Sequence, residues 1–207
     1  MKSKKTLYQF AIFLAIITVG YNFIEGITAV YFGLDDEILT LFGFGLDSFV
    51  EVISGIGIWH MVLRIRNCKN EQKDRFEKRA LQITGIAFYL LTLGLITSAI
   101  YNFISGDHPK TTFWGIVIAG ISILVMWWLI REKIKVGNAL NSDAIIADAN
   151  CTKACMQLSF VLFASSIGYE LLGIGQIDAA GSLIIAGIAF REGQEAFEKA
   201  KNKNNCC

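Results

Sequence analysis

The sequence is poor in charge. Only 18% of its 207 residues are Asp, Glu, Lys or Arg, and the formal net charge is +1. This balance gives no indication of nucleic-acid binding. Instead, 54% of the residues are hydrophobic and the mean hydropathy is +0.49, which is too apolar for an ordinary soluble domain. The composition therefore predicts a polytopic membrane protein.

The sequence also lacks the in–out alternation that marks the strands of a membrane barrel. Runs such as AIFLAIITVG and GIVIAGISILVMWWLI are continuously apolar. Backbone polar groups in lipid must be satisfied within a helix or a closed barrel, so we predict an all-α bundle. Six stretches approach the roughly 20 residues that cross a bilayer. They cover residues 7–32, 38–63, 80–104, 112–130, 144–173 and 179–190, the last extended at either end.

A large polar domain is absent as well. After residue 190 the sequence continues only with REGQEAFEKA and KNKNNCC. We predict a six-helix transmembrane domain over residues 1–190, and a short cytosolic helix with a disordered tail over residues 191–207. The role of Cys206 and Cys207 in that tail is open between the collection of soft metal ions and no role. The function must then lie within the membrane.

Basic residues are scarce in every second loop. The loops GLDDE, SGDHPK and GIGQID contain one basic residue, Lys110, whereas the amino-terminal segment, the other two loops and the tail are rich in Lys and Arg. Under the positive-inside rule this alternation puts both termini in the cytosol. We therefore expect a multi-pass protein of the cell membrane.

Ionisable residues at membrane depth are costly and usually mark a pathway or a site. The second predicted helix reads GFGLDSFVEVISG. Its Asp47 and Glu51 are four residues apart, so both carboxylates point to the same side of the helix. Two like charges on one buried face repel each other unless a proton or a cation lies between them. A polar patch neutralised by lysines is the alternative, and we favour the cation because one lysine alone, Lys153, lies deep enough.

The fifth predicted helix reads DANCTKAC near residue 150. At about 100° per residue, Asp148, Cys151, Cys155 and Ser159 form one stripe, and Lys153 points elsewhere. Cysteines four apart on a helix have poor geometry for a disulfide. Thiolates with carboxylates suit zinc, whereas calcium and magnesium prefer oxygen ligands. Metal binding at such ligands releases protons, which is the chemistry of an exchanger.

The metal ligands that we expect are Asp47, Glu51, Cys151 and Cys155 or Asp148, and which of the last two binds is left open. Glu25 forms a polar face on the first helix with Tyr21 and Asn22. Glu25 is expected either to relay protons near the metal or to form a buried ion pair with Lys153, and both roles are compatible. The two histidines, His60 and His108, are expected to be structural or solvated.

The ligand pattern resembles that of the cation diffusion facilitator family. In GLDSFVEVISG, Asp47 and Glu51 fall on the family's paired positions in helix two. In SDAIIADANCTKAC, Cys151 and Cys155 fall on those in helix five. IDAAGSLIIAGIAFREGQEAFEKA is similar to the family's sixth helix and its exit. With YNFIEG and GFGLDS, these motifs resemble most a short branch that lacks the C-terminal cytosolic metal-binding domain.

The resemblance implies a transporter rather than an enzyme, without a prosthetic group. It would export a divalent cation from the cytosol by proton-coupled alternating access, with residues 1–190 as the cation-transporter domain. Glutamate at position 51 and cysteines at positions 151 and 155 depart from the family's usual ligands, so zinc is the expected cargo, with cadmium or another thiophilic ion as the alternative. A homodimer would have to form through the membrane helices.

Two rival interpretations of the sequence remain. One is a membrane-embedded thiol oxidoreductase that uses Cys151 and Cys155, and the other is a metal-binding membrane protein without transport.

Overall fold

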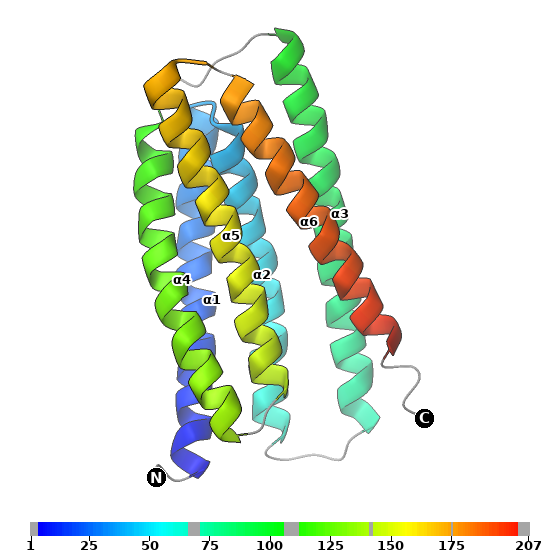
Figure 1. Cartoon of the computed structure of the whole chain (residues 1–207). Helices are drawn as coiled ribbons and strands as arrows, with labels where there is room; N and C mark the ends of the chain where they lie inside the picture. The colour runs from blue at the N-terminus through cyan, green and yellow to red at the C-terminus, as the bar shows by residue number, and fades with distance from the viewer. Residues whose placement is uncertain (1–3, 66–70, 106–111, 141–142, 175, 203–207) are drawn as a thin grey trace.

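A computed structural model describes residues 4–65, 71–105, 112–140, 143–174 and 176–202. The described residues form six helices and no strand, which confirms the predicted all-α class (Figure 1). The helices are α1 (Lys4–Asp35), α2 (Leu39–Ile65), α3 (Glu71–Ser105), α4 (Phe113–Leu140), α5 (Asp143–Leu172) and α6 (Gln176–Asn202). Cys206, Cys207 and His108 lie outside the described residues, as does the side chain of His60.

Two helices extend well beyond the predicted bounds, and two predicted helices join into one. Helix α3 begins at Glu71 instead of residue 80, and α4 ends at Leu140 instead of residue 130. The last apolar stretch and the short charged helix predicted after residue 190 form one continuous helix, α6, which ends at Asn202. Hydropathy marks the part of a helix that suits lipid, but helical hydrogen bonding continues through Glu-, Lys- and Ala-rich segments, since these residues favour helices. As a consequence, Lys133 and Glu192 lie on the main helices rather than beyond them.

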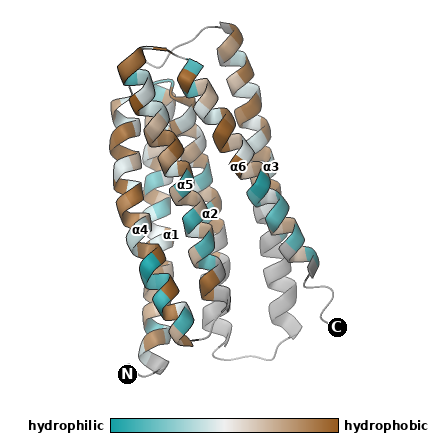
Figure 2. Ribbon diagram, in the orientation of Figure 1, coloured by the Kyte–Doolittle hydropathy of each residue, from teal (hydrophilic) through white to brown (hydrophobic). Residues whose placement is uncertain are grey.

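The outer surface of the bundle is apolar. Leu124 is 70% exposed, Phe103 is 71% exposed and Ile104 is 80% exposed, and Figure 2 shows that hydrophobic residues are spread along several helices. Within the described residues, three stretches are long and apolar enough to cross a membrane: Thr6–Asp35, Phe113–Leu140 and Asp148–Leu172. Such surfaces are favourable against lipid and unfavourable against water, so the chain is a membrane protein.

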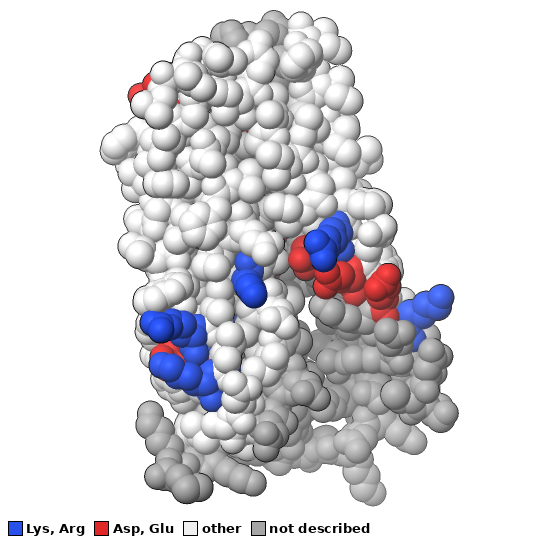
Figure 3. Space-filling model, in the orientation of Figure 1, with Lys and Arg blue, Asp and Glu red and all other residues white. Residues whose placement is uncertain are grey.

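The helices divide into two groups. Helices α1, α2, α4 and α5 pack together, while α3 and α6 pack against each other along one flank (Figure 1). The start of α1 and the end of α6 lie toward the same end of the bundle as the last turns of α2 and α4 and the first turns of α3 and α5. On the face shown in Figure 3, the described Lys and Arg side chains gather toward this end. The charge asymmetry agrees with the predicted orientation, which itself remains a prediction.

Two close contacts fix α2 against its neighbours. A Cβ at Gly45 would lie 2.7 Å from the backbone nitrogen of Val30, so glycine lets α2 approach α1 closely. At the N-terminus of α2, the Asp178 carboxylate of α6 accepts hydrogen bonds from the backbone N–H groups of Leu39 at 2.7 Å and Thr40 at 3.2 Å, and from the Thr40 hydroxyl. These N–H groups have no partner within their own helix, so Asp178 caps α2 and ties α6 to it.

The core consists of two apolar clusters separated by a polar layer. One cluster contains Phe44, Leu95, Leu158 and Leu162, and the other contains Leu14, Met126, Leu129 and Val136. Buried polar residues occupy the level between them on four helices. They are Asn22 and Glu25 on α1, Asp47, Ser48 and Glu51 on α2, Ser122 on α4, and Thr152 and Ser159 on α5. This layer contains the candidate site.

Candidate metal site

Helices α2 and α5 meet in the polar layer. The Cys155 thiol of α5 donates a hydrogen bond to Oδ2 of Asp47 of α2, with 2.9 Å between sulfur and oxygen. Both side chains are almost completely buried, since Asp47 is 1% exposed and Cys155 is 2% exposed. Residues 108 positions apart in the sequence thus bring a carboxylate and a thiol together at the core of the bundle.

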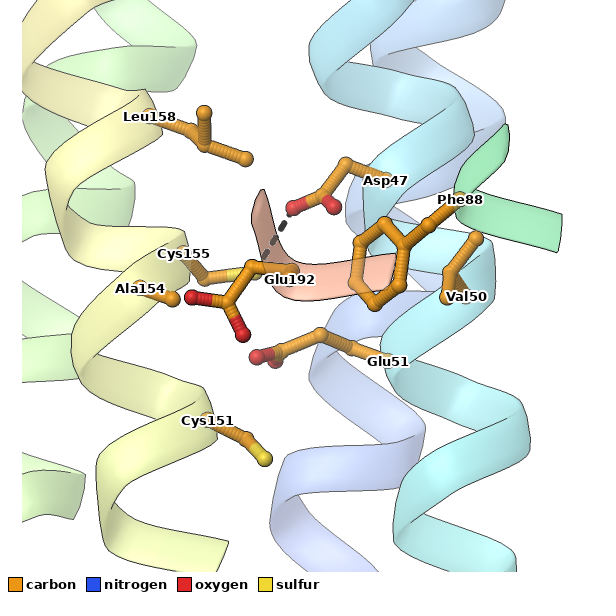
Figure 4. Close-up of a pocket in the computed structure, with 9 residues that line it drawn as sticks. All are labelled: Asp47, Val50, Glu51, Phe88, Cys151, Ala154, Cys155, Leu158 and Glu192. Carbon is orange, nitrogen blue, oxygen red and sulfur yellow. Dashed lines mark hydrogen bonds between the residues drawn. The ribbon is translucent and has the colours of Figure 1, made fainter. Parts of the chain in front are cut away.

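A small pocket surrounds this pair (Figure 4). It has a volume of about 30 Å³, enough for one or two water-sized occupants. Its ionisable lining residues are Asp47, Glu51, Cys151, Cys155 and Glu192, and its apolar walls are Val50, Phe88, Ala154 and Leu158. The pocket therefore lies where α2 and α5 face α3 and α6.

The two carboxylates of α2 have different partners. Oε2 of Glu51 accepts a hydrogen bond of 2.7 Å from the side-chain amide of Asn22, which connects α1 to the site. Oδ1 of Asp47 is buried and has no hydrogen-bond partner among the described residues. A buried acceptor without a partner costs about 1–3 kcal/mol, and more when it is charged. A cation in the pocket would satisfy this oxygen.

Glu25 lies beside α2 but does not line the pocket. Its carboxylate accepts hydrogen bonds from the hydroxyl of Tyr21 at 2.7 Å and from that of Ser48 at 3.1 Å. The expected ion pair between Glu25 and Lys153 is not formed, because Lys153 is exposed on the outer side of α5. Two hydroxyl groups therefore hold the Glu25 carboxylate, and one of them belongs to Ser48, which directly follows Asp47 in the chain.

Among the lysine side chains that the structure describes, the buried one is Lys133 rather than Lys153. Lys133 is 1% exposed, and its ammonium lies 2.8 Å from Oδ2 of Asp148 and donates to the Thr152 hydroxyl at 2.8 Å. Asp148 is thus engaged in an ion pair and is absent from the lining of the pocket. The sequence predicts Lys133 in a cytosolic segment because the apolar stretch ends at residue 130, whereas α4 continues for another ten residues.

Sequence reasoning also missed Glu192. The sequence predicts Glu192 in the short cytosolic helix after the last apolar stretch, yet in the structure it lines the pocket from α6. The buried residues Ala189, Gly193 and Ala196 surround it on α6. Small residues at spacings of three and four mark the packing face of a helix, and this signal was available in the sequence.

The described residues do not form a ready-made metal site. No three His, Cys, Asp or Glu side chains among them stand close enough to hold one metal ion together. Cys151 and Cys155 are both thiols rather than a disulfide, and the Cys155 proton occupies one oxygen of Asp47. Binding of a cation at this pair would therefore require loss of that proton and rotation of neighbouring carboxylates toward the pocket.

The comparisons with known proteins assign the class. Residues 11–201 match the family described as the cation efflux transmembrane domain, and the chain belongs to this family. This confirms the resemblance to cation diffusion facilitators. Among individual relatives, the chain is 29% identical over 196 residues to the manganese efflux system protein MneP of Bacillus subtilis (strain 168). The match covers 87% of this chain and 64% of MneP, so the chain spans less than two thirds of that relative's length.

Proposed function

We propose that this protein exports a thiophilic divalent cation, zinc or cadmium, through the pocket between α2 and α5. The observation that carries the proposal is the 2.9 Å hydrogen bond between the Cys155 thiol and the Asp47 carboxylate, beside Glu51 and Cys151. Zinc binds thiolate sulfur at about 2.3 Å and carboxylate oxygen at about 2.0–2.2 Å, usually with four ligands. Membership of the cation efflux family supports transport as the role of this site.

Cation binding at this site would exchange the ion for protons. Cysteine binds metal as a thiolate, so the proton that Cys155 shares with Asp47 leaves when the ion arrives and returns when the ion departs. Glu25 is our candidate for a relay of such protons, because it is buried and bonded to Ser48, the neighbour of Asp47 in the chain. The export of the cation from the cytosol is then coupled to the entry of protons.

Alternating access requires the pocket walls to separate on each side in turn. The walls come from α2 and α5 on one side and from the α3–α6 pair on the other. We propose that the α3–α6 pair shifts relative to the other four helices and opens the pocket first to the cytosol and then to the outside. The predicted cytosolic termini and cell-membrane location make this movement an export, and a homodimer through the membrane helices remains a prediction.

Manganese is the second candidate cargo. The relative MneP is named as a manganese efflux protein, and the carboxylates of Asp47 and Glu51 are suitable manganese ligands. Cys151 and Cys155 argue against manganese, because thiolates favour softer metals. The rival role as a thiol oxidoreductase is weakened by the family assignment and by the position of both cysteines within α5, four residues apart rather than in a CxxC motif at the start of a helix.

Flux into proteoliposomes that carry a pH gradient tests the proposal. We expect zinc and cadmium to move only with the gradient, and faster than manganese. Asp47→Asn, which keeps the size of the side chain and removes its charge, should reduce flux to the level of empty liposomes. Glu132→Gln, outside the pocket, is the control and should transport normally. Full transport by Asp47→Asn would refute the site, and preferred manganese flux would refute the cargo.

A further inference from the structure

The charged end of α6 has two faces of different character. On the outer face, Arg191 is exposed and lies 3.7 Å from Glu195, one helical turn further on. On the inner face, Glu192 is half-buried among Ala189, Gly193 and Ala196, all three of which are buried. Glu192 therefore belongs to the packing face of α6 rather than to its exposed charged face.

The inner face of α6 presents Glu192 to the pocket between α2 and α5. Figure 4 shows the Glu192 side chain in the space that Glu51, Cys151 and Cys155 also border. With Asp47, the pocket contains three carboxylates and two thiols, and none of its nine lining residues is basic. Three carboxylates of one sign in a small pocket are stable together when protons or a cation lie between them.

The buried oxygen Oδ1 of Asp47 provides a second, independent indication of a cation. It has no hydrogen-bond partner among the described residues, although Asp47 is 1% exposed. A proton on Cys155 satisfies only the other oxygen of Asp47. A divalent cation beside Asp47 would satisfy Oδ1 and neutralise its neighbours.

We propose that Glu192 is a ligand of the transported cation, contributed by α6. The inference rests on the proposed function and adds a donor from the second helix group to the same site. After the side-chain rotations that cation binding requires, Asp47, Glu51, Cys155 and Glu192 would supply the four ligands that zinc and cadmium commonly take in proteins. The bound cation joins the α3–α6 pair to α2 and α5. Binding or release of the cation therefore changes the contact between the two groups of helices that must move relative to each other.

Cadmium binding to the purified full-length protein in detergent tests this assignment. Calorimetry measures the affinity, ultraviolet cadmium–thiolate absorption reports the sulfur ligands, and cadmium NMR reports the whole ligand set. Glu192→Gln should weaken binding at least about tenfold, a loss of about 1.4 kcal/mol. It should also shift the cadmium resonance, because one oxygen ligand is lost, and leave the thiolate absorption in place. Glu198→Gln, an exposed position on the same helix, is the matched control and should behave as the native protein.

The outcomes separate this inference from the proposed function. If Asp47→Asn abolishes binding while Glu192→Gln leaves both the affinity and the resonance unchanged, Glu192 is not a ligand and the exporter proposal stands. If Asp47→Asn also binds cadmium normally, the site itself is wrong. If Glu192→Gln fails to fold, Glu192→Asp keeps the charge and shortens the side chain by one methylene. An unchanged cadmium resonance in that variant would then overturn the assignment.

Discussion

Four buried carboxylates of the bundle have partners of different chemical kinds. Asp148 has the Lys133 ammonium, Glu25 has two hydroxyls, Glu51 has the Asn22 amide, and one oxygen of Asp47 has the Cys155 thiol. Among these four, Asp148 alone has a full countercharge. Asp47 and Glu51 are held by groups that a metal ion displaces readily, since neutral donors bind a carboxylate less strongly than cations do. The capacity to bind a cation is therefore concentrated at these two residues.

The ion pair between Lys133 and Asp148 is predicted to be structural. Lys133→Met leaves the Asp148 charge buried without its partner, so we expect it to lower the free energy of unfolding by about 3–5 kcal/mol. The double variant Lys133→Met/Asp148→Leu removes both charges and should recover most of this loss. Thermal unfolding in detergent measures the effect. Lys135→Met, whose side chain is 67% exposed and paired with Glu132, should change stability by less than about 1 kcal/mol.

The residues of the site could be predicted from the sequence to different degrees. Asp47, Glu51 and Cys155 could be found because charges and thiols spaced four apart are conspicuous in an apolar helix. Lys133 and Glu192 could not be found in the same way, because both follow the last apolar residue of their stretch. Whether such a residue lies in water or in the core depends on how far the helix continues and which neighbour packs against it. Hydropathy measures neither property.

Among the elements, α1 and α2 show how small residues set the distance between helices. Gly45 faces the backbone of Val30, whereas a Cβ at Gly20 of α1 would have nothing within 4 Å. The frequency of glycine in these helices indicates close packing, but the sequence does not distinguish a glycine at a helix contact from one that faces lipid. That distinction requires the rotation of each helix about its own axis.

Gly45→Ala and Gly20→Ala form a matched pair that tests this contact. Gly45→Ala places a methyl group 2.7 Å from the Val30 nitrogen, so we expect it to destabilise the protein by about 1–3 kcal/mol through forced separation of α1 and α2. Gly20→Ala meets no neighbour and should be neutral or stabilising by up to about 1 kcal/mol, because alanine favours the helix. Unfolding in detergent compares them. Equal stability of the two variants would contradict the close approach.

At the scale of the whole molecule, the six-helix architecture was predicted and the grouping of the helices was not. Continuous apolar runs are sufficient to predict the helices, because a segment in lipid must satisfy its own backbone hydrogen bonds. The pairing of α3 with α6 depends on side-chain shape along both helices, and no periodic pattern in the sequence specifies it. This grouping nevertheless determines which walls of the pocket belong together, and hence which helices can move as a unit.

The orientation of the molecule gives a prediction for limited proteolysis. Trypsin cleaves after Lys and Arg, and the loops predicted to face outward contain Lys110 as their single basic residue, in a segment outside the described residues. Trypsin added to intact cells should therefore cut the protein at Lys110 or not at all, and Lys110→Gln should be fully resistant. In inverted vesicles, both the native protein and this variant should be cut in the basic cytosolic segments, for example after Arg64 or Arg66. Cleavage of the Lys110→Gln variant in intact cells would mean that these basic segments face outward. The site would then load cations from outside, and the protein would carry out uptake rather than export.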